Sequence, residues 1–280
     1  MKKIVLNDGN AIPELGLGTY RLKPNEAYNS VKAALAMGYR HIDTANVYFN
    51  EEAIGRAINE SGIPREELFI TSKIFPNAFK EIDKAIDNTL DRLGIDYLDL
   101  LLLHRPYGDY VSAYTRLVEA KKNGKTKSVG VSNFTMKHLA ALESKTEVIP
   151  AINQIEITPY FTRDEERRLM KEKGTVIEAW SPFGSGSKTL LHDPLLEKVA
   201  KAHDKSVPQV IIRFLLDKEI VVFPGSKSEP HIKSNFEIGD FTLTEDETKA
   251  IESLNTKKPA KDLFGKFLYR LLPKDFSDRE

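Results

Sequence analysis

Short apolar runs recur along the chain between amphipathic stretches. Residues 3–6 and 11–14 flank the turn Asn7-Asp8-Gly9-Asn10, which predicts an N-terminal β-hairpin. Eight later runs are apolar on both faces, which is typical of parallel strands covered by helices. These runs span residues 15–18, 40–43, 68–72, 98–104, 128–132, 151–156, 175–180 and 220–224.

The stretches between these runs have the period of a helix. Apolar residues at spacings of three and four predict helices over 27–37, 81–93, 111–123, 135–144, 163–173, 195–202, 208–217 and 230–236. Eight strand-helix alternations predict an α/β fold of the (β/α)8 TIM barrel type. A doubly wound sheet with a small second domain is the alternative. Because no linker rich in Pro, Gly or Ser divides the chain, we expect one domain over 1–280.

The C-terminal part extends beyond the predicted barrel. Residues 245–255 predict one further surface helix, and residues 257–274 carry six basic residues against one acidic residue. We therefore expect a basic and apolar extension over 257–280 that docks on the barrel or forms a dimer contact. The residues of its apolar face would be Leu263, Phe264, Phe267, Leu268, Leu271 and Leu272.

Composition narrows the class of protein. The chain is 41% hydrophobic and 29% charged, as globular proteins are, and its 41 basic and 41 acidic residues balance. This balance argues against a protein that binds a nucleic-acid backbone. There are no cysteines, no apolar run is long enough to span a membrane, and the N-terminus turns polar too early for a signal peptide. We expect a cytoplasmic protein with no metal site, since the six histidines lack metal-ligand spacing.

Three polar residues close consecutive predicted strands. Asp43, Lys73 and His104 lie 30 and 31 residues apart, one strand-helix unit each time, and Tyr48 follows Asp43 by five residues. Parallel strands of a barrel end on the same rim, so these side chains are expected to meet there. Taken singly, such residues are often a helix cap, an extended surface lysine or a structural histidine. Their common position on adjacent strands favours a catalytic site.

This combination has a definite chemistry. A neighbouring carboxylate keeps a buried lysine charged, and the charged lysine is expected to lower the pKa of Tyr48 below the ordinary value of about 10. A phenol tuned in this way is a general acid for a carbonyl oxygen that gains negative charge. His104 would donate a second hydrogen bond and orient that carbonyl.

Six stretches of the chain carry a family resemblance. They are residues 38–45 running on to 48–51, then 71–73, 102–106, 130–134, 153–156 and 178–182. In this order and spacing they resemble the aldo-keto reductases from Gly16 to about Leu254, and the general form looks most like the prokaryotic branch that includes the diketogluconate reductases. The resemblance implies a barrel that binds NADPH or NADH without a Rossmann domain and reduces aldehydes and ketones to alcohols.

The resemblance also implies roles for particular residues. Tyr48 is the general acid, Asp43 and Lys73 tune it, and His104 positions the substrate carbonyl. The substrate side would further include Tyr20, Phe75 and Arg105. The residues implied for the cofactor are Thr19, Asp43, Ser132, Asn133, Gln154, Trp180, Ser181, Phe183, Gly184, Ser185, Gly225, Ser226, Lys227, Ser228, His231 and Asn235.

The sequence departs from the family pattern near residue 225. NADPH-preferring relatives typically carry Lys-Ser and, further on, Arg where this chain has Gly225-Ser226 and His231. Two fixed cations that would neutralise a 2′-phosphate are absent, although Lys227, Ser228 and Lys233 lie nearby. We expect the enzyme to use NADPH or NADH, with a preference that is relaxed or shifted toward NADH.

Some alternatives stay open at this stage. Arg105 would hold a substrate carboxylate or phosphate if it faces the pocket, or pair with a neighbouring acid if it does not. The rival functions are a nicotinamide-binding regulatory subunit with slow or no turnover and an unrelated metal-dependent barrel isomerase or hydrolase. The expected partner is a small carbonyl compound, and a monomer is expected, with a dimer as the alternative.

Overall fold

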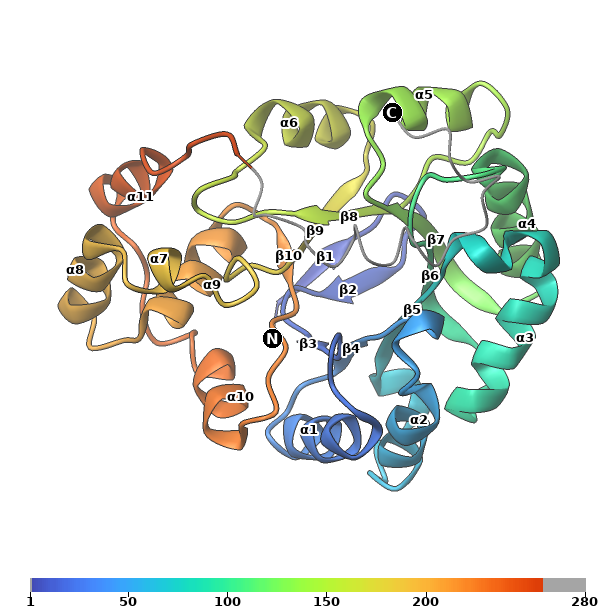
Figure 1. Cartoon of the computed structure of the whole chain (residues 1–280), viewed down its shortest axis with the longest axis horizontal. Coiled ribbons are helices and arrows are strands. Elements are labelled where there is room, and N and C mark those ends of the chain that lie inside the picture. The colour runs from blue at the N-terminus through green and yellow to red at the C-terminus, as the bar shows by residue number, and fades with distance from the viewer. Residues whose placement is uncertain (1, 259–280) are drawn as a thin grey trace.

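The computed structural model describes residues 2–258 and contains a closed ring of parallel strands (Figure 1). The strands pair in chain order: β3 (Leu17–Gly18), β4 (His41–Asp43), β5 (Phe69–Ile74), β6 (Leu98–Leu103), β7 (Thr126–Ser132), β8 (Ile152–Glu156), β9 (Val176–Trp180) and β10 (Val221–Val222). Backbone hydrogen bonds join β10 to the residues before β3, from Gly16 N to Val222 O at 2.8 Å and from Val222 N to Glu14 O at 2.9 Å. These bonds close the sheet, so the predicted (β/α)8 barrel is confirmed.

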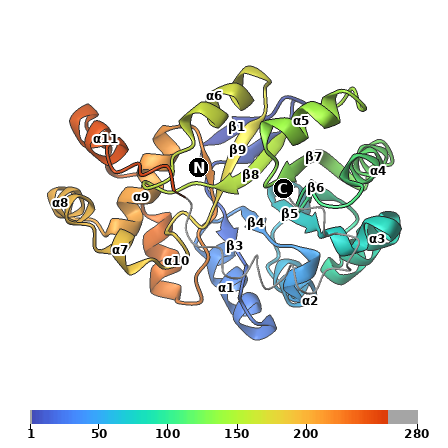
Figure 2. The same ribbon diagram turned by 45° about the horizontal axis from the view of Figure 1, so that its top comes forward.

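Helices surround the strands, as Figure 1 shows. Most of them follow the predicted ranges: α1 (Pro24–Ala36), α3 (Ile82–Leu93), α4 (Tyr110–Lys122), α5 (Met136–Glu143), α6 (Asp164–Glu172), α8 (Pro194–Ala202), α9 (Val207–Asp217), α10 (Glu229–Phe236) and α11 (Glu245–Glu252). Figure 2 shows α8 and α11 on the outer side of α9. None of the helices within residues 2–258 has the length and apolar character that crossing a membrane requires.

Two helices were absent from the sequence prediction, α2 (Glu51–Asn59) and the single turn α7 (Lys188–Leu191). Helix α2 contains Gly55, and an interior glycine lowers helix propensity by about 1 kcal/mol. The packing explains this glycine, because a Cβ at Gly55 would lie 2.2 Å from the carbonyl oxygen of Leu93 at the end of α3. Only glycine lets α2 and α3 approach so closely. Tertiary packing therefore stabilises α2 against its weak local preference.

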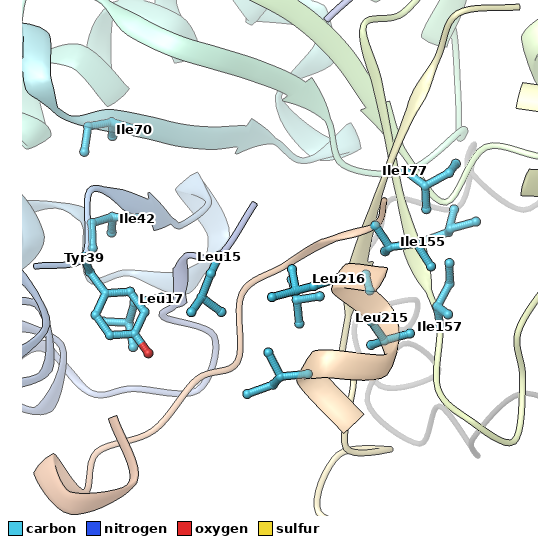
Figure 3. Packing of buried hydrophobic residues seen from close by; sticks show 14 of the residues in the cluster. Leu15, Leu17, Tyr39, Ile42, Ile70, Ile155, Ile157, Ile177, Leu215 and Leu216 are labelled. Carbon is cyan, nitrogen blue, oxygen red and sulfur yellow. The ribbon is translucent and has the colours of Figure 1, made fainter. Parts of the chain in front are cut away.

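The apolar core has two parts. The larger part lies between the barrel and its helices, and Figure 3 shows Tyr39 and Ile42 on its left and Ile155 and Ile177 on its right. The smaller part fills the amino-terminal end of the barrel, where the hairpin of β1 (Lys3–Val5) and β2 (Ala11–Pro13) covers the opening. This smaller cluster consists of Leu6, Ile12, Phe69, Leu100, Leu102, Ala151, Ile152 and Val221. Because apolar side chains fill this end of the barrel, a polar site can form at the opposite end, where the carboxyl ends of the strands lie.

Two sequence predictions concern the chain after the barrel. Helix α11 confirms the helix expected over 245–255 and ends at Glu252. The basic and apolar extension expected over 257–280 lies outside the described residues, apart from Lys257 and Lys258.

Candidate active site

A cavity of about 310 Å³ opens at the carboxyl ends of the strands. Most of the residues that line it were candidates from the sequence: Tyr20, Asp43, Tyr48, Phe75, His104, Arg105, Ser132, Asn133, Gln154, Trp180, Ser181, Phe183, Ser185 and Gly225. The sequence reasoning missed Gly18, Arg21, Pro182, Gly186, Phe223 and Pro224. Each missed residue lies within two positions of a candidate, so widening each motif by two residues would have found them.

A buried ion pair forms the base of this cavity. Lys73 Nζ lies 2.6 Å from Asp43 Oδ1 and donates a second hydrogen bond to the backbone oxygen of Thr44 at 2.8 Å. Both charged side chains are buried. Burial by itself lowers the pKa of the lysine, but the charge of Asp43 and its hydrogen bond to Lys73 act against burial, and the pKa lies above its ordinary value. Lys73 therefore remains an ammonium ion.

Tyr48 lies on a single 3-10 turn, η1 (Asn46–Tyr48), directly above this pair. The ring centroid is 5.1 Å from Lys73 Nζ and 5.0 Å from the ring of Tyr20. Burial raises the pKa of Tyr48 to about 12, although the charge of Lys73 opposes this shift. The expectation that Lys73 lowers this pKa below 10 is therefore wrong for the free protein. Loss of water around the hydroxyl outweighs the attraction of one ammonium that Asp43 already neutralises.

His104 lies on the other side of Tyr48, with ring centroids 5.7 Å apart in an edge-on arrangement. Burial, followed by the charges of Lys73 and Arg105, lowers the pKa of the imidazole well below its ordinary value. The ring is therefore neutral and carries one N–H. Its buried Nδ1 has no hydrogen-bond partner within residues 2–258. A neutral imidazole beside a phenol supplies two hydrogen-bonding groups for a single carbonyl oxygen.

The loop that carries Tyr48 is fastened at the residues that follow it. The side chain of Asn50 donates to the backbone oxygens of Thr19 and Leu22 at 3.0 and 3.1 Å. Glu51, at the start of α2, accepts from Ser72 Oγ at 2.7 Å and from Arg92 Nε at 2.8 Å. These buried contacts fix the position of Tyr48. Asn50 and Glu51 were included in the sequence prediction only within the motif over residues 48–51. The side-chain contacts of Asn50 and Glu51 are called the latch below.

Amide and aromatic groups form the opposite wall. Trp180 Nε1 donates to Asn133 Oδ1 at 2.9 Å, and Asn133 Nδ2 donates to Ser132 Oγ at 2.9 Å and to the backbone oxygen of His104 at 3.2 Å. Asn133 has a φ of 64°, a left-handed conformation that asparagine tolerates. Next to it, Gln154 Nε2 donates to Asp43 Oδ2 at 2.8 Å. This network holds the indole and the amides in fixed orientations around the cavity.

Several candidates lie away from the cavity wall. Thr19 is buried and donates to the backbone oxygen of Asp43 at 2.9 Å, and the amide of Gly184 is bonded to the oxygen of Ser181 within its own loop. Lys73 also does not line the cavity, because it lies beneath Asp43. The other candidates lie in residues 226–235, here called the phosphate-side segment. They are Ser226, Lys227, Ser228, His231 and Asn235, none of which lines the cavity.

Polar side chains of the phosphate-side segment bond to close neighbours. Ser226 Oγ accepts from the backbone N–H of Ser228 at 3.0 Å, and Lys227 Nζ lies 3.2 Å from Glu26 Oε1 in an exposed ion pair. Lys227, a candidate partner of a 2′-phosphate, therefore already has an acidic partner.

The donor set of the cavity fits a nicotinamide cofactor. Trp180 offers an aromatic face, Gln154 and Asn133 offer amides, and Tyr48 and neutral His104 offer hydrogen bonds beside them. Within residues 2–258, no three His, Cys, Asp or Glu side chains gather as metal ligands do. The fold and the site together define a barrel oxidoreductase that uses a nicotinamide cofactor.

Comparison with known proteins identifies the family. The model of the Aldo/keto reductase family matches residues 14–256. An aldehyde reductase of Saccharomyces cerevisiae is 40% identical over 94% of this chain and 95% of its own length, and a glycerol 2-dehydrogenase (NADP(+)) of the same yeast is 38% identical over 93% of each chain. The crystal structure of an aldo/keto reductase from Brucella melitensis is 41% identical, covers 91% of this chain and 99% of its own, and superposes with a TM-score of 0.87.

The chain therefore belongs to the aldo/keto reductase family. It is an oxidoreductase that reduces aldehydes or ketones to alcohols with a nicotinamide cofactor, as the sequence predicts. The comparisons support neither the regulatory subunit nor the metal-dependent isomerase or hydrolase.

Proposed function

We propose that Tyr48 is the general acid of carbonyl reduction, with Lys73 and Asp43 as the groups that tune it and His104 as the group that orients the carbonyl. The bound nicotinamide supplies the hydride. Tyr48 and His104 face the same cavity, so both can donate hydrogen bonds to one carbonyl oxygen. As that oxygen gains negative charge, Tyr48 transfers its proton, and the Lys73 ammonium stabilises the phenolate that remains.

The raised pKa of Tyr48 suits this role in the direction of reduction. With a pKa of about 12 in the free protein, the phenol keeps its proton throughout the physiological range. Tyr48 is therefore protonated before the reaction begins. It transfers this proton only when a stronger base forms beside it. The neutral state of His104 matters in the same way, because an imidazole N–H donates without repelling Lys73.

The buried contact between Lys73 and Asp43 beneath the ring of Tyr48 carries this proposal. Its test is Tyr48→Phe, which should lower kcat for reduction of a simple aldehyde by about 10²–10⁴. Cofactor binding should survive, and the single tryptophan, Trp180, lies in the cavity and reports it by fluorescence. A variant that reduces aldehydes as fast as the parent would contradict the assignment.

We propose that the enzyme accepts both NADH and NADPH. Gly225 and His231 offer no fixed cation to a 2′-phosphate, and Lys227 already forms an ion pair with Glu26. The residues proposed to hold the nicotinamide are Ser132, Asn133, Gln154 and Trp180, those for the pyrophosphate are Ser181, Phe183, Gly184 and Ser185, and those for the adenosine phosphate are Gly225, Ser226, Lys227, Ser228, His231 and Asn235. Ratios of kcat/KM test the preference. A ratio of about 100 in favour of NADPH would contradict dual use.

Arg105 is proposed as an anchor for an anionic substrate, beside Tyr20 and Phe75 on the substrate side of the cavity. It lines the cavity next to His104, and its charge contributes to the lowered pKa of that imidazole. Arg105→Ala should raise KM for keto acids by about tenfold, because a charge-assisted hydrogen bond is worth about 1.5–3 kcal/mol. A neutral aldehyde serves as the control substrate. Equal effects on both substrates would discard the idea.

Two further properties remain predictions of the sequence. A monomer is proposed, and sedimentation of the full chain across protein concentrations tests it against a dimer. A cytoplasmic location is the other, and fractionation of cells that express the protein tests it.

A further inference from the structure

Glu178 is a buried carboxyl group inside the barrel that takes no part in the proposed proton transfer. It lies on β9 two residues before Trp180, so both side chains point inward and Glu178 lies one layer below the cavity wall. Its side chain is fully buried. Bulky branched residues usually fill the interior of such barrels, so an acid at this depth requires an explanation.

The amide of Gln154 connects this acid to the catalytic ion pair. Gln154 Nε2 donates to Asp43 Oδ2 at 2.8 Å and to Glu178 Oε2 at 2.9 Å. These two bonds use both hydrogens of the amide nitrogen. The reversed amide would place its oxygen against the Asp43 carboxylate, which has no proton to donate to it. The carbonyl oxygen of Gln154 is therefore the part of the amide that remains for the cavity, which Gln154 lines.

The charges around Glu178 come from two other strands. Asp43 and His41 lie on β4, and Lys73 lies on β5. His41 Nε2 is 3.7 Å from Glu178 Oε1, but burial lowers the pKa of His41 to about 3, so this imidazole is neutral. Burial, followed by the charge of Asp43, raises the pKa of Glu178 to about 8, and the hydrogen bond from Gln154 and the charge of Lys73 oppose that shift. Glu178 thus mostly keeps its proton at neutral pH.

We propose that Glu178 is a positioning residue for cofactor binding: it fixes the Gln154 amide so that the carbonyl oxygen accepts a hydrogen bond from the carboxamide of the nicotinamide. This inference rests on the proposed function, in which the cavity holds NADH or NADPH. Asp43 alone offers the amide nitrogen one acceptor, and one bond leaves the amide free to rotate about it. Glu178 supplies the second acceptor and removes that freedom.

The test compares two variants by calorimetry with two ligands, NADPH and ADP-ribose, which lacks the nicotinamide. Glu178→Leu keeps the volume but removes the acceptor, and should weaken NADPH binding by about tenfold, the value of one well-placed hydrogen bond. Binding of ADP-ribose should change by less than about twofold. Glu178→Gln retains an acceptor oxygen for Gln154 and should restore NADPH binding.

The outcomes separate this inference from the proposed function. Failure of the parent protein to bind either ligand would overturn the proposed function. Normal binding by the parent together with unchanged NADPH affinity in Glu178→Leu would overturn the role of Glu178 alone. An equal loss for both ligands would also overturn it, because it would indicate general distortion.

A pH series supplies a second readout if Glu178→Leu does not fold. NADP⁺ carries a positive charge on its nicotinamide that NADPH lacks, so ionisation of Glu178 should favour NADP⁺. Between pH 6.5 and 9, the affinity ratio of NADP⁺ to NADPH should rise by about fivefold or more in the parent and stay level in Glu178→Gln. Parallel curves for the two proteins would contradict the inference.

Discussion

The catalytic end and the phosphate-side segment, both proposed to take part in cofactor use, are built differently. At the catalytic end, Lys73 and Asp43 are buried and bonded at 2.6 Å, and the network continues to Gln154. In the phosphate-side segment, Lys227 is 70% exposed and meets Glu26 at the surface. A buried network loses several kcal/mol when one partner is removed, whereas an exposed pair is worth about 0–1 kcal/mol. Substitutions should therefore have large effects in the first region and small ones in the second.

The sharpest test of this contrast substitutes one lysine in each region. Lys73→Met leaves the Asp43 carboxylate without its buried partner, and should lower the free energy of unfolding by about 3–5 kcal/mol and abolish most reductase activity. Lys227→Met should change stability by less than about 0.5 kcal/mol. Urea unfolding measures both variants. Similar losses in the two proteins would show that burial does not separate the regions.

A smaller effect is expected at the latch behind Tyr48. Glu51→Gln removes the charge that Arg92 contacts at 2.6 Å in a site where the glutamate is 1% exposed. We expect a loss of about 2–3 kcal/mol in unfolding free energy and about a tenfold fall in kcat, because Tyr48 loses its fixed position. The exposed neighbour Glu52 is the matched control, and Glu52→Gln should leave both quantities unchanged. Equal behaviour of the two variants would contradict the proposal that the contacts of Glu51 hold Tyr48 in position.

The difference between the buried catalytic end and the exposed phosphate-side segment also explains which site residues could be placed from the sequence. Asp43, Lys73 and His104 lie at the ends of consecutive strands, and the strand period and the barrel topology bring Asp43 and His104 to one cavity and Lys73 against Asp43. Their placement needed no knowledge of loops. The phosphate-side segment follows a two-residue strand, and nothing in the local pattern indicated that Lys227 would meet Glu26, 201 positions away in sequence.

Electrostatic environment was harder to predict than position. The raised pKa of Tyr48 depends on how completely the surrounding residues exclude water, which is a property of the whole fold. Glu178 was part of a quoted motif, but its burial between Gln154 and His41 follows from contacts among β4, β8 and β9. Gly55 is a similar case, since its reason lies in the distant residue Leu93.

The buried acid Glu178 should make the stability of the catalytic end depend on pH. Its pKa is raised from 4.5 to about 8 in the folded protein, so the stability that its protonated form contributes is complete below pH 4.5 and is lost as the pH rises through 8. Glu178→Gln cannot ionise. The difference in unfolding free energy between variant and parent should therefore shift in favour of the variant by about 2 kcal/mol between pH 5 and 7. A difference independent of pH would contradict the raised pKa.

The smallest expected effect lies in the phosphate-side segment. Glu26→Gln removes the acidic partner of Lys227, and Gln at this position still accepts the bond from the backbone N–H of Lys23 that caps α1. The freed ammonium can then approach a 2′-phosphate, so NADPH should bind about two- to fourfold more tightly, in line with an exposed pair worth less than 1 kcal/mol. NADH has no 2′-phosphate and serves as the control ligand, with no change expected. Tighter binding of both cofactors would indicate a general effect of charge at the rim, and a gain for NADPH much above tenfold would mean that the segment is held as rigidly as the catalytic end.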